Sequence, residues 1–287
     1  MRPLPRTLAP FRARVLAGAL ALLAGGGASA QSGASGADTA TFKDATTGLW
    51  VNTYGNIRVS DRVFWIAQTH FRFVGTESGE GATGRPFVGE FAQLYNRHAV
   101  SYLFSKKFRA SLGGVLRVNY NTGGVAARER RTVPEWRIWH EYLWAVPLGR
   151  AYFYHRVRLE HRWTRGFRDD AEWVFRNRWR YMLSAKVPIN KPKLGVHAFY
   201  VGPEAEVILQ SGRTVAGSPL EDLRLHTSFG YIATPRVTFA AGLMYSMGQT
   251  LGAPAVYKQK WTPRLHAYFS PDWRKIKSKL PEIHRNE

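Results

Sequence analysis

One short stretch of the sequence gathers arginines on a single side of the chain. Residues 154–163 read YHRVRLEHRW, and Arg156, Arg158, Glu160 and Arg162 occupy alternate positions in it. Alternation of this kind is the period of a β-strand, so these four side chains share one face. Guanidinium groups so placed can bind an anion, or they can pair with carboxylates in a site shielded from water.

The segments on either side carry charges at the same period. The turn PLGR at 147–150 predicts a two-residue hairpin loop at Leu148-Gly149, and we centre the following loop near Asp169. The opposite pairs that these loops predict are Arg137–Glu160, Glu141–Arg156, Glu160–Arg178 and Arg158–Arg180. The predicted charge ladder therefore consists of Arg137, Glu141, Arg156, Arg158, Glu160, Arg176, Arg178 and Arg180. We expect it to be structural, with a preference for anions as a secondary consequence.

A hydrolytic site is the second chemistry to weigh. Asp222 and Ser246 are predicted to be neighbours, but His226 lies about 13 Å further along the same face. A nucleophile and its base need a separation of about 3 Å, and the sequence has no GxSxG motif. We assign no catalytic residue. An enzyme that hydrolyses or transfers acyl chains of envelope lipids stays open as an alternative.

The histidines do not form a metal-ligand pattern. The nine His are scattered, and His155 and His161 fall on the apolar side of their strand. A metal site needs three or four convergent donors. We therefore expect no metal and no cofactor.

The elements that must position these residues are β-strands. We count eleven segments with two-residue periodicity: 47–57, 63–74, 88–104, 108–120, 134–145, 151–163, 172–185, 193–210, 219–231, 236–248 and 257–270. Bacterial membrane barrels have even strand numbers, so we add a strand at 38–46 and predict twelve, with ten as the second choice. The apolar positions change parity at Gly202-Pro203, which predicts a bulge there.

The connections alternate between short turns and longer loops, which is typical of an antiparallel up-and-down outer-membrane barrel. Trp136 and Trp144 lie on the apolar face of one strand, about 20 Å apart along the membrane normal. We predict aromatic girdles that include Trp136, Trp144, Trp163 and Trp173. The polar face would then line the lumen. A soluble periplasmic β-sandwich is the remaining alternative.

The N-terminal residues form a targeting signal. Basic residues precede the apolar run VLAGALALLAGGGA, and Ala28-Ser29-Ala30 fits a cleavage site. We expect a signal peptide at 1–30, a polar segment at 31–46, the barrel at 47–270 and a basic periplasmic tail at 271–287. The chain contains no Cys, so its stability in an exported compartment cannot depend on disulfides.

Four motifs resemble a known family: YNRHAVSYLFSKKF, EWRIWHEY, YHRVRLEHRW and FRNRWRYMLSAKVPI. In order and spacing they are similar to an uncharacterised bacterial family, domain of unknown function 2490, over roughly residues 45 to 270. The resemblance implies an outer-membrane β-barrel and assigns no activity. The basic tail extends beyond Phe269, the aromatic that usually ends such a chain.

These observations predict a non-enzymatic barrel in the outer membrane of a Gram-negative envelope. Its role would be structural, or it would pass small solutes or anions through an arginine-rich lumen. The expected partners are outer-membrane lipids and, during biogenesis, the barrel-assembly machinery. Nucleic acid is not expected despite the formal net charge of +21, because the mature chain leaves the cytoplasm.

Overall fold

The fold is all-β. The computed structural model describes residues 41–76, 84–215, 218–249 and 256–274. The eleven strands in these ranges are β1 Thr41–Arg58, β2 Val63–Thr76, β3 Arg85–Ser105, β4 Phe108–Tyr120, β5 Thr132–Leu148, β6 Ala151–Thr164, β7 Val174–Pro188, β8 Phe199–Ser211, β9 Leu220–Thr234, β10 Val237–Gln249 and β11 Val256–Phe269. None of the described residues forms a helix long and apolar enough to cross a membrane.

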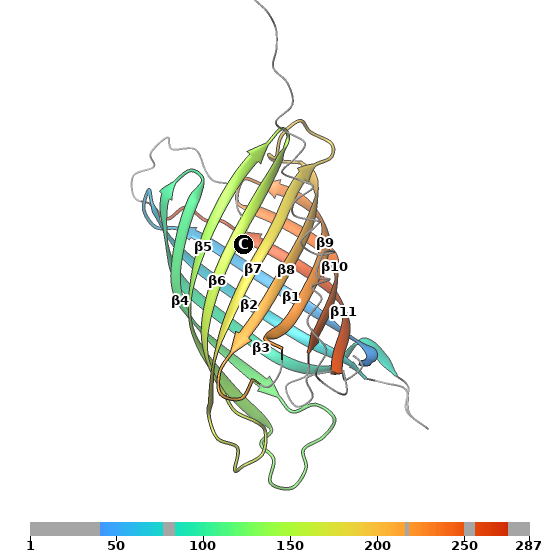
Figure 1. Cartoon of the computed structure of the whole chain (residues 1–287). Coiled ribbons are helices and arrows are strands. Elements are labelled where there is room, and N and C mark those ends of the chain that lie inside the picture. Colours follow the sequence, from blue (N-terminus) through green and yellow to red (C-terminus); the bar gives the residue numbers. More distant parts are fainter. Residues whose placement is uncertain (1–40, 77–83, 216–217, 250–255, 275–287) are drawn as a thin grey trace, which may run out of the picture. The chain divides into compact units, whose positions relative to one another are not determined.

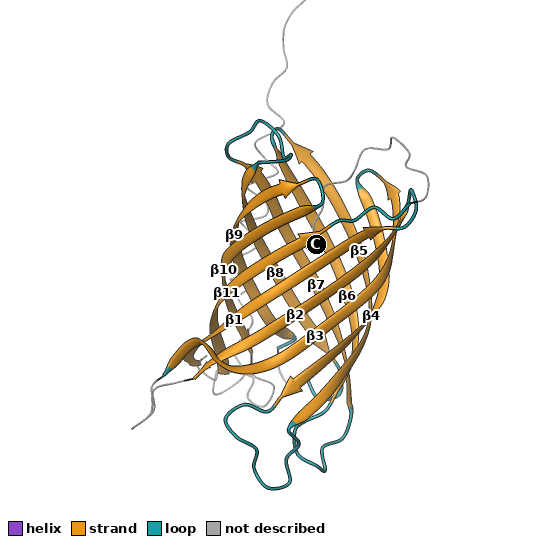
Figure 2. Ribbon diagram, turned by 180° about the vertical axis from the view of Figure 1, so that it is seen from behind, coloured by secondary structure: helices purple, strands orange, loops and turns teal. Residues whose placement is uncertain are grey.

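The strands close into one barrel (Figures 1 and 2). Each strand pairs antiparallel with its neighbours in sequence, whereas β1 and β11 pair in parallel, with Thr41 opposite Val256 and Gly55 opposite Phe269. The barrel is therefore mixed, and the expectations of twelve or ten strands and of a purely antiparallel sheet are wrong. The eleven segments were counted correctly, but residues 41–46 form the first part of β1 rather than a strand of their own.

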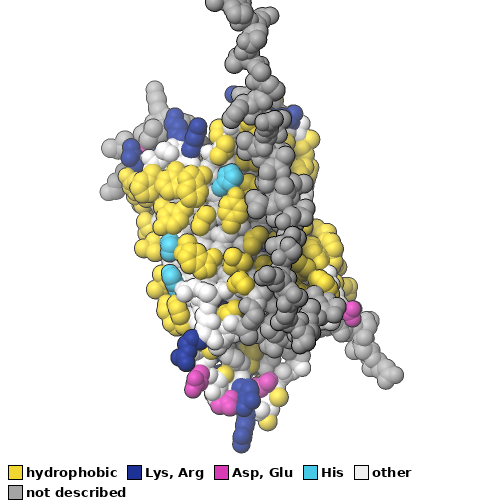
Figure 3. All heavy atoms as spheres, viewed as in Figure 1, with side chains coloured by type: hydrophobic (Ala, Val, Ile, Leu, Met, Phe, Trp, Pro, Cys, Tyr) yellow, Lys and Arg dark blue, Asp and Glu magenta, His cyan; other side chains and the backbone are white. Residues whose placement is uncertain are grey.

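Side chains alternate between the lumen and the outside of the wall. On β5, Glu135, Arg137, Trp139 and Glu141 are buried inside, while Trp136 and Ile138 are 51% and 52% exposed. Figure 3 shows the outcome: hydrophobic side chains cover the middle of the visible face, and charged side chains gather toward the two ends. The parity that the sequence pattern predicts for this strand is confirmed.

The β5–β6 turn has a different position from the one predicted. Leu148 pairs with Ala151, so Gly149 and Arg150 form the two-residue loop. Gly149 has φ +61°, a value that glycine adopts without steric cost and that the first central position of a type II′ turn requires. Moving the turn by one residue slides the register by two. The lumen face is unchanged, but every predicted partner across β5 and β6 is displaced by one inward position.

On β8 and β9 the lumen face is apolar near the short turns and polar further along the strands. Ala198, Tyr200 and Ile232 form one buried cluster at the short-turn end. Gly230 makes room for it, because a Cβ there would lie 2.1 Å from Tyr200 Cζ. Along β8 the same alternate side chains point into the lumen throughout, but these side chains change from apolar to polar. This gradient explains the parity switch at Gly202-Pro203, and the predicted bulge is wrong: the register on β8 shifts between Ile208 and Leu209 instead.

The predicted segments outside the barrel wall are described only in part. The signal peptide at 1–30 and the polar residues 31–40 lie outside the described residues. Of the basic tail, residues 271–274 are described, and they lie against the β1–β2 turn. Asp272 bridges to Arg58, the Trp273 amide donates to Arg58 O at 2.8 Å, and Arg274 pairs with Asp61 at 2.6 Å.

Candidate functional site

Glu160 on β6 is the centre of a charge network that crosses the lumen. Its exposed fraction is 0%. Its Oε2 accepts hydrogen bonds from Arg137 Nη1 at 2.7 Å and from Arg178 Nη1 at 3.2 Å, and its Oε1 accepts one from Arg180 Nη1 at 2.9 Å. Arg97 Nη2 on β3 lies 3.6 Å away. One carboxylate on β6 thus holds four guanidinium groups from three other strands, β3, β5 and β7.

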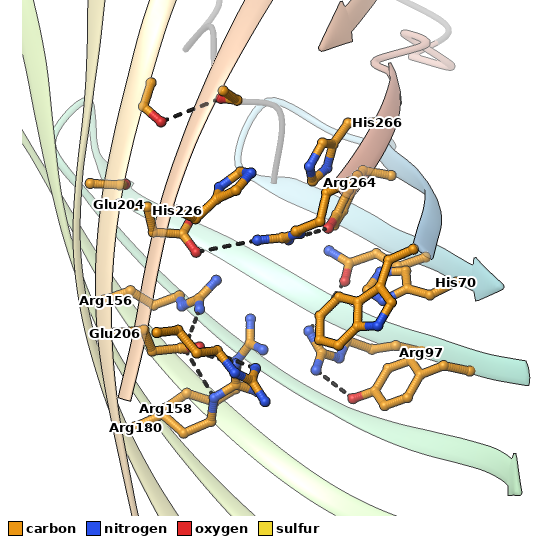
Figure 4. Close-up of a pocket in the computed structure, with 18 of the residues that line it drawn as sticks. His70, Arg97, Arg156, Arg158, Arg180, Glu204, Glu206, His226, Arg264 and His266 are labelled. Carbon is orange, nitrogen blue, oxygen red and sulfur yellow. Dashed lines mark hydrogen bonds and ion pairs between the residues drawn. The ribbon is translucent and has the colours of Figure 1, made fainter. Parts of the chain in front are cut away.

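Glu206 on β8 is the second centre (Figure 4). Its Oε1 accepts from Arg180 Nε at 3.0 Å and from Arg156 Nη2 at 2.7 Å, and Arg180 Nη2 also reaches Oε2 at 2.7 Å. Arg224 Nη1 on β9 lies 3.5 Å away. Because Arg180 also binds Glu160, it connects the two centres. The planar guanidinium group of Arg180 binds the carboxylate through two nitrogens at once. Such bidentate bonds form in only one relative orientation, so they orient the side chains as well as neutralise them.

A third group of ion pairs lies toward the long-loop end. Glu135 accepts from Arg162 Nε at 3.1 Å and also pairs with Arg117. Arg162 Nη1 continues to Glu221 on β9 at 3.1 Å, and Arg178 Nε reaches the same carboxylate at 2.6 Å. Strands β6 and β9 are not adjacent in the sheet. These contacts therefore connect wall strands through the lumen.

Aromatic side chains fill the space between the guanidinium groups. The buried Trp139 ring lies 5.0 Å from the Arg97 guanidinium carbon and 4.9 Å from that of Arg158, within the range of a cation–π contact. The Tyr95 hydroxyl accepts from Arg97 Nη2 at 2.5 Å and from Arg137 Nη1 at 3.4 Å. The network is therefore packed on apolar surface and does not stand free in a wide channel.

The observed register places like charges opposite each other. Arg137 faces Arg162, and Arg158 faces Arg180. Of the predicted pairs, Glu160–Arg178 and Arg158–Arg180 are confirmed. Arg137–Glu160 and Glu141–Arg156 are wrong as cross-strand partners, because the shifted turn sets Glu160 opposite Trp139 and Glu141 opposite Arg158. Directly opposed like charges destabilise a sheet, so the compensating carboxylates must reach them from other directions.

Most of the predicted ladder lies inside the barrel. Its buried members are Arg137, Glu141, Arg156, Arg158, Glu160, Arg178 and Arg180. Arg176 is half-buried near the long-loop end, where it donates to Thr164 Oγ1 at 3.0 Å. The ladder did not include Glu206, Glu221 or Tyr95. Strict alternation along β8 and β3 would have placed Glu206 and Tyr95 on the lumen face, but nothing local in the sequence shows which arginines they reach.

A central cavity of about 110 Å³ adjoins the network, between the arginines and a group of rings. His70, His226 and His266 are buried along it, and five of their ring nitrogens have no hydrogen-bond partner among the described atoms (Figure 4). A cavity of this size holds several water molecules, which can satisfy such groups. Within the described residues no three His, Asp or Glu side chains converge in a way that could hold a metal ion.

The described residues also do not assemble a hydrolytic triad. Ser246 lies opposite Arg224, and His226 lies opposite Met244. Asp222 accepts a hydrogen bond from Arg224 Nε at 2.8 Å. No hydrogen bond joins His226 to Asp222 or Ser246 in this part of the chain. The predicted proximity of Asp222 and Ser246 is wrong by two residues of register.

Three of the four predicted girdle residues, Trp136, Trp144 and Trp163, are on the outside of the wall, and Trp173 is exposed in a loop. Trp136 and Trp163 pair with each other across β5 and β6 toward the long-loop end, and Trp173 lies before β7. Trp144 lies toward the other end, where its ring stacks on Phe108 with centroids 5.1 Å apart. Their exposed fractions lie between 36% and 51%. Whether they meet a bilayer stays a prediction.

Comparison with known proteins gives one match. Residues 47–256 match a family described as "Protein of unknown function (DUF2490)". No curated protein matches. No solved structure matches either. The family match covers most of the chain, including most of β1, all of β2 to β10 and their buried arginine–glutamate network, and so this protein belongs to the DUF2490 family.

Proposed function

We propose that this protein is a non-enzymatic outer-membrane β-barrel whose lumen is closed by its arginine–glutamate network. In this proposal the network holds the barrel in one shape and blocks free diffusion of solutes. Outer-membrane lipids surround the wall, and the barrel-assembly machinery inserts the chain. The secretory signal expected at 1–30 would deliver it to the envelope.

The outer surface supports the membrane location. Each strand has 13 residues or more, which exceeds the roughly 9–11 that a tilted membrane-spanning strand needs. Large apolar side chains are exposed around the wall, among them Leu112 at 62% and Val100 at 63%. A soluble protein rarely exposes a continuous apolar surface of that extent.

The burial of Glu160 is the observation that carries the proposal of closure. A carboxylate in the middle of an open pore would be exposed to water, whereas Glu160 has no exposed surface and lies among Arg137, Arg178 and Arg180. The adjoining cavity, at about 110 Å³, is smaller than the roughly 300 Å³ at which small-molecule sites begin. In some proteins, buried polar or ionic groups also specify one arrangement of the core.

Planar-bilayer recording of the refolded full chain tests this proposal. We expect the protein to insert, as seen by its heat-modifiable migration on a gel, and to give no steady porin-like conductance. A steady conductance would refute closure. Failure to insert, together with recovery in the soluble fraction of cells, would refute the membrane location and favour the soluble alternative. Hydrolysis of envelope lipids that is lost in His226→Ala would favour the enzyme.

A further inference from the structure

A second recess lies in the lumen toward the long-loop end, next to the central cavity. Its volume is about 480 Å³. We call it the vestibule; its lining includes Trp50, Arg72, Arg176, Gln210, Gln249 and Lys260. This volume falls within the roughly 300–1,000 Å³ of small-molecule sites. Anion binding in this recess does not depend on whether the lumen centre conducts.

The vestibule contains positive charge that the protein does not neutralise. Arg72, Arg176 and Lys260 line it, and none of them has a carboxylate partner within the described ranges. The two acidic residues of the lining are already engaged, Glu221 with Arg178 and Asp222 with Arg224. Cations in a recess shielded from bulk water require a counter-charge. Arg72, Arg176 and Lys260 are half-buried, so an anion bound in the vestibule would supply the counter-charge that the protein does not.

The unpaired cations approach the vestibule from opposite sides. Arg72 on β2 lies with its guanidinium carbon 3.8 Å from the centre of the Trp50 ring and donates to Gln93 Oε1 at 3.3 Å. Lys260 is on β11, which pairs with β1 on the side opposite to β2. Its Nζ extends over Gly48, where a Cβ would lie 2.8 Å from it. Arg176 is on β7, half-way round the barrel from β1.

Two neutral side chains add hydrogen-bonding capacity without charge. Gln210 and Gln249 are 4% and 5% exposed and line the vestibule. Neither side-chain amide forms a hydrogen bond with the described residues, although each carries two N–H donors. Neither amide is among the fully buried polar groups that lack a partner, so both face the open space of the recess, where they can donate to a bound ligand.

We propose that the vestibule binds a compact anion that carries phosphate groups and at least two negative charges. Several donors on Arg72, Arg176, Lys260 and the two glutamines surround one recess, and a phosphate offers acceptor oxygens in several directions at once. A planar carboxylate would reach fewer of them, and a neutral sugar would leave the three cations uncompensated. The phosphate can belong to a soluble molecule or to a lipid headgroup.

Titration calorimetry of the full chain in detergent micelles tests the proposal. Pyrophosphate is the soluble probe, and micelles that contain phosphatidic acid are the lipid probe. Arg72→Gln and Lys260→Gln each remove one unpaired charge, and we expect each to weaken binding roughly tenfold or more. Lys106→Gln removes an exposed charge at the opposite, short-turn end and should change affinity less than about twofold.

Each outcome decides the matter. Pyrophosphate binding that falls in both variants supports a soluble ligand, and phosphatidic acid binding alone with the same losses supports a headgroup. If neither probe binds the folded parent, the proposal is overturned. It is equally overturned if Lys106→Gln weakens binding as much as Lys260→Gln, because the attraction would then be unspecific. Heat-modifiable migration on a gel shows whether each variant is folded. If Arg72→Gln does not fold, the test depends on Lys260→Gln, because Lys260 is half-buried.

Discussion

The replacement Glu160→Gln tests the structural role of the network most directly. Glutamine keeps the shape of the side chain and removes its charge. Arg137, Arg178 and Arg180 then lose the carboxylate that accepts from all three, at 2.7, 3.2 and 2.9 Å. The amide also brings two donors to a place where the neighbouring groups are donors. The variant therefore both removes attraction and adds unsatisfied hydrogen-bonding groups.

The size of the effect follows from the burial of the site. Removal of one partner from a buried ion pair costs about 3–5 kcal/mol, because the other charge is left uncompensated, whereas exposed pairs contribute about 0–1 kcal/mol. Glu160 has an exposed fraction of 0%, so the larger figure applies. With a urea dependence near 3 kcal/mol per M, typical of the upper end for folded domains, the unfolding midpoint should fall by about 1–2 M.

Unfolding in urea, followed by loss of the fast-migrating folded band on a gel, measures this change. Glu172→Gln is the matched control, because Glu172 is exposed before β7 and has no ion-pair partner within the described residues. Its unfolding midpoint in urea should equal that of the parent. Equal midpoints for Glu160→Gln, Glu172→Gln and the parent would refute the reasoning and would mean that water fills the centre of the lumen.

Three further predictions concern the wall and the ends of the barrel. In liposomes of brominated lipid, Trp fluorescence should be strongly quenched. Trp179 is on the outer face and Trp139 is inside the lumen, so Trp179→Phe should reduce the quenched fraction and Trp139→Phe should not. Equal effects of the two variants would contradict the membrane assignment. The chain has no Cys, so Thr41→Cys and Ser270→Cys each introduce a single labelling site. Because β1 and β11 are parallel, an impermeant maleimide should reach the two sites from opposite sides of the membrane. Labelling of both sites from the same side would contradict an odd strand number. Arg274 donates to both carboxylate oxygens of Asp272, at 2.9 and 2.7 Å, and holds the pKa of that carboxyl below its ordinary value. A lowered pKa means that the contact persists as pH falls to about 4 and is lost only in stronger acid, so hydrogen exchange should find the Trp273 amide protected at pH 4 in the parent and unprotected in Asp272→Asn.

The sequence by itself determined the strands and their two faces. The two-residue period is a local property, because successive side chains of an extended chain point to opposite sides regardless of what they later meet. Alternation therefore placed Arg156, Arg158 and Glu160 together on the lumen face of β6. It also located eleven segments, with errors at their ends that reach six residues at the starts of β1 and β8. The charge on that face was visible for the same reason.

Tertiary structure decided how the barrel closes and which charges meet. The rule of even strand numbers is a regularity among known barrels, and nothing in residues 41–58 prevents β1 from pairing in parallel with β11. The register of β5 and β6 depended on whether Leu148 or Gly149 began the turn, a difference of one residue that slides every pair by two. Several partners that neutralise the arginines, Glu206 and Glu221 among them, come from strands that are not hydrogen-bonded to β6. Contacts across a lumen depend on the distance between opposite walls, which the curvature of the closed barrel sets. No local pattern along the chain encodes that distance.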